Sequence, residues 1–252
     1  MFQLIYILLT VIAHCHSFEV ICYFGSWSLY RTENVVDLST YANKCTQIIY
    51  SFAKLDEKTN QIQSLDKELD LARNGYYKVT SLRNRNPRLK VLIAIGGWSE
   101  GSEKYSKMVA NETSRAQFVE SVVDFLNLHK FDGLDLDWEH PTQRGGQPED
   151  KVNFGLLCAE LSAKLRPQGK LLTAATNGGS WISDQAYDFE SLKKSIDIFH
   201  VMNYDLHGTW ERKAYHHAPL KLSKMDSPDF FTIERSMNYY KGKGIGEYPT
   251  FN

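Results

Sequence analysis

The chain has 252 residues, of which 42% are hydrophobic and 13% aromatic, and its formal net charge is −1. These values are typical of a globular domain with a large core. The nearly balanced charge gives no electrostatic basis for binding nucleic acid or an anionic membrane, so we expect neither as a partner.

The N-terminus is typical of a secretory signal peptide. Leu4–Ala13 is an apolar run too short to span a bilayer, and small residues follow it, so we expect removal of residues 1–17 with cleavage after Ser17. The segment before this run has no Lys or Arg, which leaves a buried first strand or helix as the alternative. A signal peptide would place residues 18–252 in an oxidising, extracellular compartment.

Short runs rich in β-branched residues and leucine alternate with helical patterns along the chain. This repeated order predicts a parallel sheet with helical crossovers in a single domain. The expected strands are Val20–Phe24, Gln47–Ala53, Lys90–Ile95, Gly133–Glu139, Leu171–Thr176 and Ile196–Asp205. The expected helices are Leu65–Leu82 with an interruption at Gly75, a helix capped by Ser114 and Gln117, Phe154–Leu165, and Phe231–Lys241.

Two of the four cysteines are expected to pair. Cys22 lies in the first expected strand and Cys45 just before the second, so a disulfide forms if these strands are neighbours. Cys158 falls in a helical pattern and is expected to be a buried free thiol. Asn111 begins an N-glycosylation acceptor, which agrees with secretion.

The run Phe131–Pro141 alternates acids with large apolar residues. Side chains alternate between the two faces of a strand, so Asp135, Asp137 and Glu139 would share one face. Three carboxylates on one strand repel each other and resist burial, which favours chemistry over a structural role. An EF-hand calcium loop does not fit, because leucine and tryptophan stand where its polar spacers and glycine would be.

The strand and helix order fits either a doubly wound α/β sheet or a (β/α)₈ TIM-type barrel. No Gly-x-Gly-x-x-Gly follows the first strand, which disfavours a dinucleotide site. In a barrel the catalytic residues lie at the carboxyl ends of the strands. Glu139 would be the last residue of the fourth strand, and three tryptophans follow expected strands, unless they are core residues. These are Trp27, Trp98 and Trp210.

These motifs resemble the family 18 glycoside hydrolases, which include the chitinases and the chitinase-like lectins. The fourth strand matches the family signature Asp-Gly-x-Asp-x-Asp-x-Glu from Asp132 to Glu139. Further similarity lies in Lys90–Trp98, where the family often has Ser in place of Ala94, and in Met202–Asp205. The first two strands and the loop around His216 and His217 are also similar to animal chitinases.

The resemblance implies a (β/α)₈ barrel of which this chain supplies strands one to six. After the helix near Met237–Lys243 we expect the family's α+β insertion and strands seven and eight to be absent. Such a C-terminally truncated barrel would leave the edges of strands one and six unpaired. It would also lack the tryptophan of strand eight, on which the sugar at the cleavage point is bound.

The resemblance also implies a substrate-assisted, retaining cleavage of chitin, a polymer of β-1,4-linked N-acetylglucosamine. Glu139 is expected to be the general acid and base, with a pKa raised by the acids behind it. Asp137 would orient the acetamide of the substrate, and Asp135 would tune Asp137. Tyr204 would donate to the acetamide oxygen, and Asp205 would line the same subsite.

Chitin or chito-oligosaccharides are the expected partners, bound by a monomer without metal or cofactor. A zinc site from His200, His207, His216 and His217 is less favoured, because their spacing lacks a paired-ligand pattern. A glycan-binding lectin, an inactive fragment and an unrelated barrel with a metal-bound carboxylate cluster are the competing hypotheses. The expected substrate-binding residues are Tyr23, Trp27, Phe52, Gly97, Trp98, Met202, Asp205 and Trp210.

Overall fold

The computed structural model describes residues 18–33, 37–224, 226, 227 and 229–246, so the expected signal peptide lies outside the described residues. Six strands form a parallel sheet in the order β1-β2-β4-β5-β6-β7, and β3 pairs antiparallel with β2. The strands are β1 (Ile21–Gly25), β2 (Gln47–Asp56), β3 (Gln61–Ser64), β4 (Lys90–Gly96), β5 (Gly133–Asp137), β6 (Leu171–Asn177) and β7 (Ile198–Met202).

The strand order decides between the two expected architectures. Each parallel strand neighbours the next in the chain, so the sheet has no point at which the order reverses, as a doubly wound fold requires. The result is a half-barrel, which confirms the incomplete (β/α)₈ expectation. In the described part of the chain, β1 and β7 each pair with a single strand.

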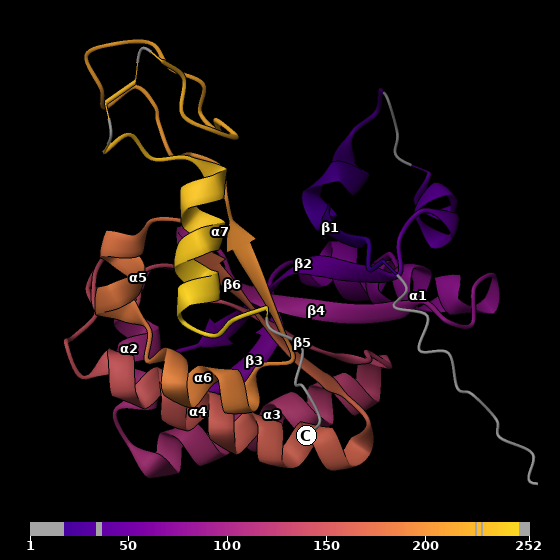
Figure 1. Cartoon of the computed structure of the whole chain (residues 1–252). Coiled ribbons are helices and arrows are strands. Elements are labelled where there is room, and N and C mark those ends of the chain that lie inside the picture. The colour runs from indigo at the N-terminus through magenta and orange to yellow at the C-terminus, as the bar shows by residue number, and fades with distance from the viewer. Residues whose placement is uncertain (1–17, 34–36, 225, 228, 247–252) are drawn as a thin grey trace, which may run out of the picture.

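Helices cover the outer face of the half-barrel (Figure 1). Apolar residues of the strands pack there against Phe118 and Leu126 from one helix and Phe154 and Leu161 from another. The opposite, inner face has only a small apolar cluster of Ile49, Leu92 and Ala94, which leaves room for polar groups. The helices are α1 (Gly75–Thr80), α2 (Glu103–Val109), α3 (Glu112–His129), α4 (Asp150–Leu165), α5 (Ser180–Ala186), α6 (Phe189–Ser195) and α7 (Ile233–Gly242).

Two expected strands end earlier than the sequence pattern suggests. β5 ends at Asp137, because its neighbour β4 leaves the sheet at Gly96 and Gly97, both with positive φ. Glu139 is therefore two residues beyond the strand, a correction of the prediction that it closes it. β7 ends at Met202, and the left-handed backbone of Asp205 turns the chain away.

The expected helices need two corrections, and one expected interruption is present. The capping box is wrong: Asn111 caps α3 by accepting from the backbone N–H of Thr113 at 2.8 Å, and Ser114 instead donates to the carbonyl of Met108. The interruption expected at Gly75 is present: Asn74 adopts a left-handed conformation, and α1 begins at Gly75. Sequence patterns also missed β3 and the three helices α2, α5 and α6, each of seven residues or fewer.

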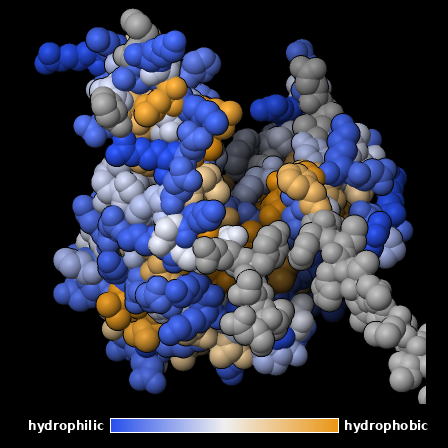
Figure 2. Space-filling model, viewed as in Figure 1, coloured by the Kyte–Doolittle hydropathy of each residue, from blue (hydrophilic) through white to orange (hydrophobic). Residues whose placement is uncertain are grey.

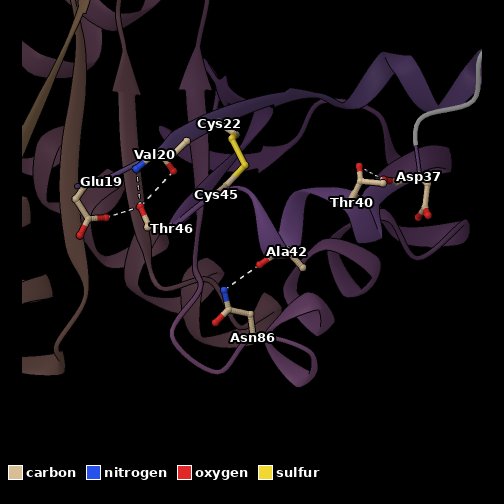
Figure 3. Close-up of a disulfide and its surroundings, with 9 residues drawn as sticks. All are labelled: Glu19, Val20, Cys22, Asp37, Thr40, Ala42, Cys45, Thr46 and Asn86. Carbon is tan, nitrogen blue, oxygen red and sulfur yellow. Dashed lines mark hydrogen bonds between the residues drawn. A yellow bond between two sulfur atoms is a disulfide. The ribbon is translucent and has the colours of Figure 1, made fainter. Parts of the chain in front are cut away.

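The expected disulfide is present. Cys22 of β1 and Cys45, just before β2, are joined as Figure 3 shows, and β1 pairs in parallel with β2. Next to it, the hydroxyl of Thr46 accepts from the backbone N–H of Val20 at 2.9 Å. Cys158 is a buried free thiol, as expected. None of the helices in the described ranges is long and apolar enough to cross a membrane.

We expect the double variant Cys22→Ser, Cys45→Ser to lose about 3 kcal/mol of unfolding free energy, because the bond closes a loop of 23 residues that the unfolded chain would otherwise leave free. Urea denaturation measures the loss. The matched control is Cys158→Ala, which removes a buried thiol that is in no disulfide. A double variant as stable as the wild type would contradict the prediction.

Candidate active site

The inner face of β5 carries two buried acids, as the alternating pattern predicts. Asp135 and Asp137 point away from the helices, whereas Leu134, Leu136 and Trp138 belong to the core beneath the helical layer. Trp138 fixes this register: its ring stacks on Tyr105, and its Nε1 donates to Ser102 Oγ at 2.9 Å.

Asp135 is fully buried and has partners from three other strands, of which β6 is adjacent to β5 in the sheet. Tyr23 of β1 donates its hydroxyl to Oδ2 at 2.8 Å, and Thr173 of β6 donates to Oδ1 at 2.5 Å. His200 of β7 places Nε2 3.6 Å from Oδ1. Burial raises the pKa of Asp135, and His200 and the two hydroxyl donors oppose that rise.

Asp137 is also buried, but its Oδ1 has no hydrogen-bond partner among the described residues. Burial, reinforced by the charges of Asp135 and Glu139, raises its pKa to about 8. Because of this raised pKa, the carboxyl group is held protonated near neutral pH, and its Oδ1 is free for a ligand. The backbone of Asp137 is closely packed, because a Cβ at Gly96 would lie 2.2 Å from the Asp137 carbonyl oxygen.

Glu139 is half-buried at the rim, beyond the end of β5. The hydroxyl of Ser102 donates to the carbonyl of His140 at 3.1 Å, which anchors the turn that follows. Burial raises the pKa of Glu139, the Arg144 charge opposes the rise, and Asp205 adds to it. The pKa of Glu139 is raised, as the sequence predicts, but the rise is caused by burial and by Asp205 rather than by the acids on β5.

Two cavities adjoin these acids and meet at Met202 and Tyr204. The first, of about 530 Å³, contains Glu139 and is lined by Trp98, Asp205 and Trp210. The second, of about 500 Å³, contains Asp137 and is lined by Tyr23, Trp27, Phe52 and His200. Figure 2 shows a hollow in the surface between the part of the molecule near β1 and the chain that follows β7. Both volumes lie in the range of ligand sites.

The structure brings almost all the expected site residues to these cavities. Trp27 stacks on Phe52 with ring centroids 6.3 Å apart, and both rings line the second cavity. Two expected residues do not line either cavity: Asp135 is buried beneath the surface, and Gly97 lies behind the ring of Phe52. Trp27, Trp98 and Trp210 are 57%, 61% and 66% exposed, so none of these three tryptophans belongs to the core.

Sequence reasoning missed three residues that the fold places here. The sequence suggests His200 only as a zinc ligand, yet it lies beside Asp135 and packs edge to face on Tyr23. Arg144 places its guanidinium carbon 3.7 Å from the centroid of the Trp98 ring. Trp181 lines the first cavity, and its position shortly after the strand β6 is the same signal that identified the other tryptophans.

The sequence and the structure are both similar to known proteins. Residues 19–249 match the family described as "Glycosyl hydrolases family 18". "Probable chitinase 2" of Drosophila melanogaster is 42% identical over 234 residues, which cover 89% of this chain and 47% of that protein. The chain therefore spans about half the length of this curated relative.

Two solved structures share the fold. The Group IV chitinase of Ostrinia furnacalis in complex with allosamidin matches with a TM-score of 0.86 and 35% identity, over 90% of this chain and 63% of that one. Human YKL-39, described as a pseudo-chitinase with retained chitooligosaccharide binding, matches with a TM-score of 0.79 and 30% identity, over 91% and 64% of the two chains.

Proposed function

The chain belongs to family 18 of the glycosyl hydrolases, and we propose that it hydrolyses the β-1,4 linkages of chitin or chito-oligosaccharides. The observation that carries the proposal is the unpaired Oδ1 of Asp137, buried beside a cavity with aromatic walls in the described part of the chain. A buried carboxyl oxygen without a donor favours a ligand that brings one. The acetamide N–H of N-acetylglucosamine is such a donor.

Glu139 acts first as the general acid. It donates its proton to the glycosidic oxygen, and the acetamide oxygen of the substrate attacks the anomeric carbon as the glycosidic bond breaks. The products of this step are the leaving oligosaccharide and an oxazolinium ion, with Glu139 now a carboxylate. Water then attacks the anomeric carbon and gives its proton to Glu139, so two displacements retain the anomeric configuration.

Asp137 orients the acetamide and balances the positive charge of the oxazolinium ion. In the free protein its raised pKa keeps it protonated near neutral pH. The acetamide N–H and the developing cation both favour its ionised form, with the proton passing toward Asp135. Tyr204 donates to the acetamide oxygen, and burial together with the Asp137 charge raises its pKa, which keeps that proton on the hydroxyl.

The aromatic residues of the cavities bind the sugar rings. Trp27 and Phe52 with Tyr23 serve the Asp137 side, and Trp98 and Trp210 serve the Glu139 side. Met202, at the junction of both cavities, and Asp205 flank the sugar that reacts. Gly97 contributes by leaving space for the ring of Phe52, because a Cβ there would lie 3.0 Å from it.

The test compares two fluorogenic disaccharides with the same leaving group, a chitobioside and a cellobioside. The cellobioside has a hydroxyl in place of each acetamide and offers no internal nucleophile. We expect release of fluorophore from the chitobioside alone. Equal release from both would refute substrate assistance, and release from neither by a folded chain would refute hydrolysis.

A glycan-binding protein without turnover is the second candidate. The similarity to human YKL-39 favours it, because that protein is described as a pseudo-chitinase that retains chitooligosaccharide binding. Retention on chitin beads without product would support this function. A chain that shows no cooperative melting would instead support the inactive fragment.

The same proposal includes secretion as a monomer. The disulfide between Cys22 and Cys45 supports it, because such bonds persist in oxidising compartments. Asn111 is exposed at the start of α3, where a glycan can be attached. Mass spectrometry of the protein from culture medium tests the cleavage after Ser17 and the glycan together.

Arg144 is expected to set the alkaline limit of activity. Its charge lowers the pKa of Glu139, so Arg144→Leu should raise that pKa and keep the acid protonated to higher pH. The alkaline limb of the pH profile of kcat/KM, which reports the free enzyme, should then move to higher pH. Lys107→Leu, an exposed lysine of α2 outside both cavities, is the control. A limb that moves to lower pH would contradict the prediction.

A further inference from the structure

A tryptophan that the proposed mechanism does not use lies in the same cavity as Glu139. Trp181 is the second residue of α5, directly after the short loop that follows β6. Its side chain is 54% exposed, and it lines the cavity of about 530 Å³ together with Trp98 and Trp210. An exposed indole inside a cavity is typical of a ligand site rather than of a core position.

The ring of Trp181 is held in place from behind. It packs edge to face on Phe231, with centroids 4.8 Å apart and planes at 81°. It also lies across Gly179, where a Cβ would be 3.0 Å from its Cη2 atom. A ring fixed in this way loses little side-chain freedom when a ligand stacks on it, so more of the contact energy appears as affinity.

The division of the acids between the two cavities tells which part of the substrate meets this ring. Asp137 lines only the second cavity, and by the proposed function it meets the acetamide of the sugar that keeps the anomeric carbon. Glu139 lines only the first, and it protonates the oxygen that departs. The first cavity, with Trp181, is therefore on the side of the leaving oligosaccharide.

We propose that Trp181 is a stacking platform for a sugar ring of the leaving group, in addition to Trp98 and Trp210. The inference rests on the proposed function and names a further specificity residue for it. The flat face of a β-linked N-acetylglucosamine ring is lined by C–H groups, which pack well on an indole. Trp181 thereby selects substrates that have several sugars beyond the cleaved bond.

The first experiment measures kcat/KM in the full chain for chitohexaose and for a chitobioside with a small fluorogenic leaving group. The ratio of kcat/KM for chitohexaose to kcat/KM for the chitobioside should fall about tenfold in Trp181→Ala, which corresponds to the loss of one ring contact. Tyr77→Ala removes an exposed aromatic of α1 outside both cavities and should leave the ratio unchanged. An unchanged ratio in Trp181→Ala would overturn the proposal.

Two replacements separate stacking from packing. Trp181→Phe keeps an aromatic face and should recover part of the ratio, whereas Trp181→Leu keeps apolar bulk against Phe231 and should not. Equal recovery by both would mean that Trp181 acts only by packing, which would overturn the proposal.

A binding measurement keeps this inference separate from the proposed function. Chitohexaose is titrated by calorimetry into Glu139→Gln and into the same variant with Trp181→Ala. The second substitution should weaken binding about tenfold. If the wild type hydrolyses neither substrate, the proposed function fails, but the titration still decides the role of Trp181: equal affinities would overturn it.

Discussion

Glu139→Gln is expected to lower kcat about 10³-fold on chitohexaose without weakening its binding, because a glutamine amide cannot donate a proton to the glycosidic oxygen. Glutamine has nearly the same shape as glutamate, and Glu139 is only half-buried, so the melting temperature should stay the same. Product formation by chromatography and affinity by calorimetry measure the two effects separately.

The control for this variant is Glu57→Gln, an exposed glutamate in the turn between β2 and β3. It should hydrolyse chitohexaose at the wild-type rate. If Glu139→Gln retained a tenth or more of the wild-type kcat, Glu139 would not be the proton donor, and another group in the cavity would have to be sought.

Asp137→Asn is expected to lower kcat about 10²-fold or more, which is the cost of removing one group that stabilises the transition state. The neutral amide can still face the acetamide, but it cannot balance the charge of the oxazolinium ion. The loss should appear mainly in kcat rather than in KM. A fall in affinity with unchanged kcat would show that Asp137 only binds the substrate.

The same variant should be more stable than the wild type at alkaline pH. The native state keeps the Asp137 proton up to a pH of about 8, whereas the ordinary pKa of this carboxyl group, which applies in the unfolded chain, is 3.8. The wild type therefore loses stability as the pH rises through this window, and an asparagine does not ionise. Urea denaturation at pH 4 and pH 9 should show a gain only at pH 9.

Asp124→Asn, at an exposed position of α3, is the control for this comparison. It should follow the wild type at both pH values. A wild type that is as stable at pH 9 as Asp137→Asn would contradict the raised pKa.

The alternating acids of β5 were predictable because strand geometry alone decides which residues share a face. Asp135 and Asp137 lie on the inner face, and Leu136 and Trp138 lie in the core, as the pattern requires. The end of the strand was not predictable, because it depends on where the neighbour β4 turns away at Gly96. The position of Glu139 beyond the strand is therefore a tertiary effect.

The sequence patterns also failed to identify the short elements, because these elements have too few residues to show a clear period. β3 has only four residues, Gln61–Ser64, and it is held by pairing with β2 rather than by its own alternation. The helices α5 and α6 have seven residues each, too few to show a clear helical period. Arg144 could not be identified at all, because only the folded loop brings its charge onto Trp98.

The anomeric form of the first product tests the account most directly, because it reports whether the acetamide of the substrate and Glu139 act together. ¹H NMR of chitohexaose during the first minutes of hydrolysis distinguishes the α and β forms of the newly made reducing ends. The account predicts the β form, which then equilibrates slowly in water. Initial formation of the α form would mean a single direct attack by water, and it would contradict the role given to Asp137 and the acetamide.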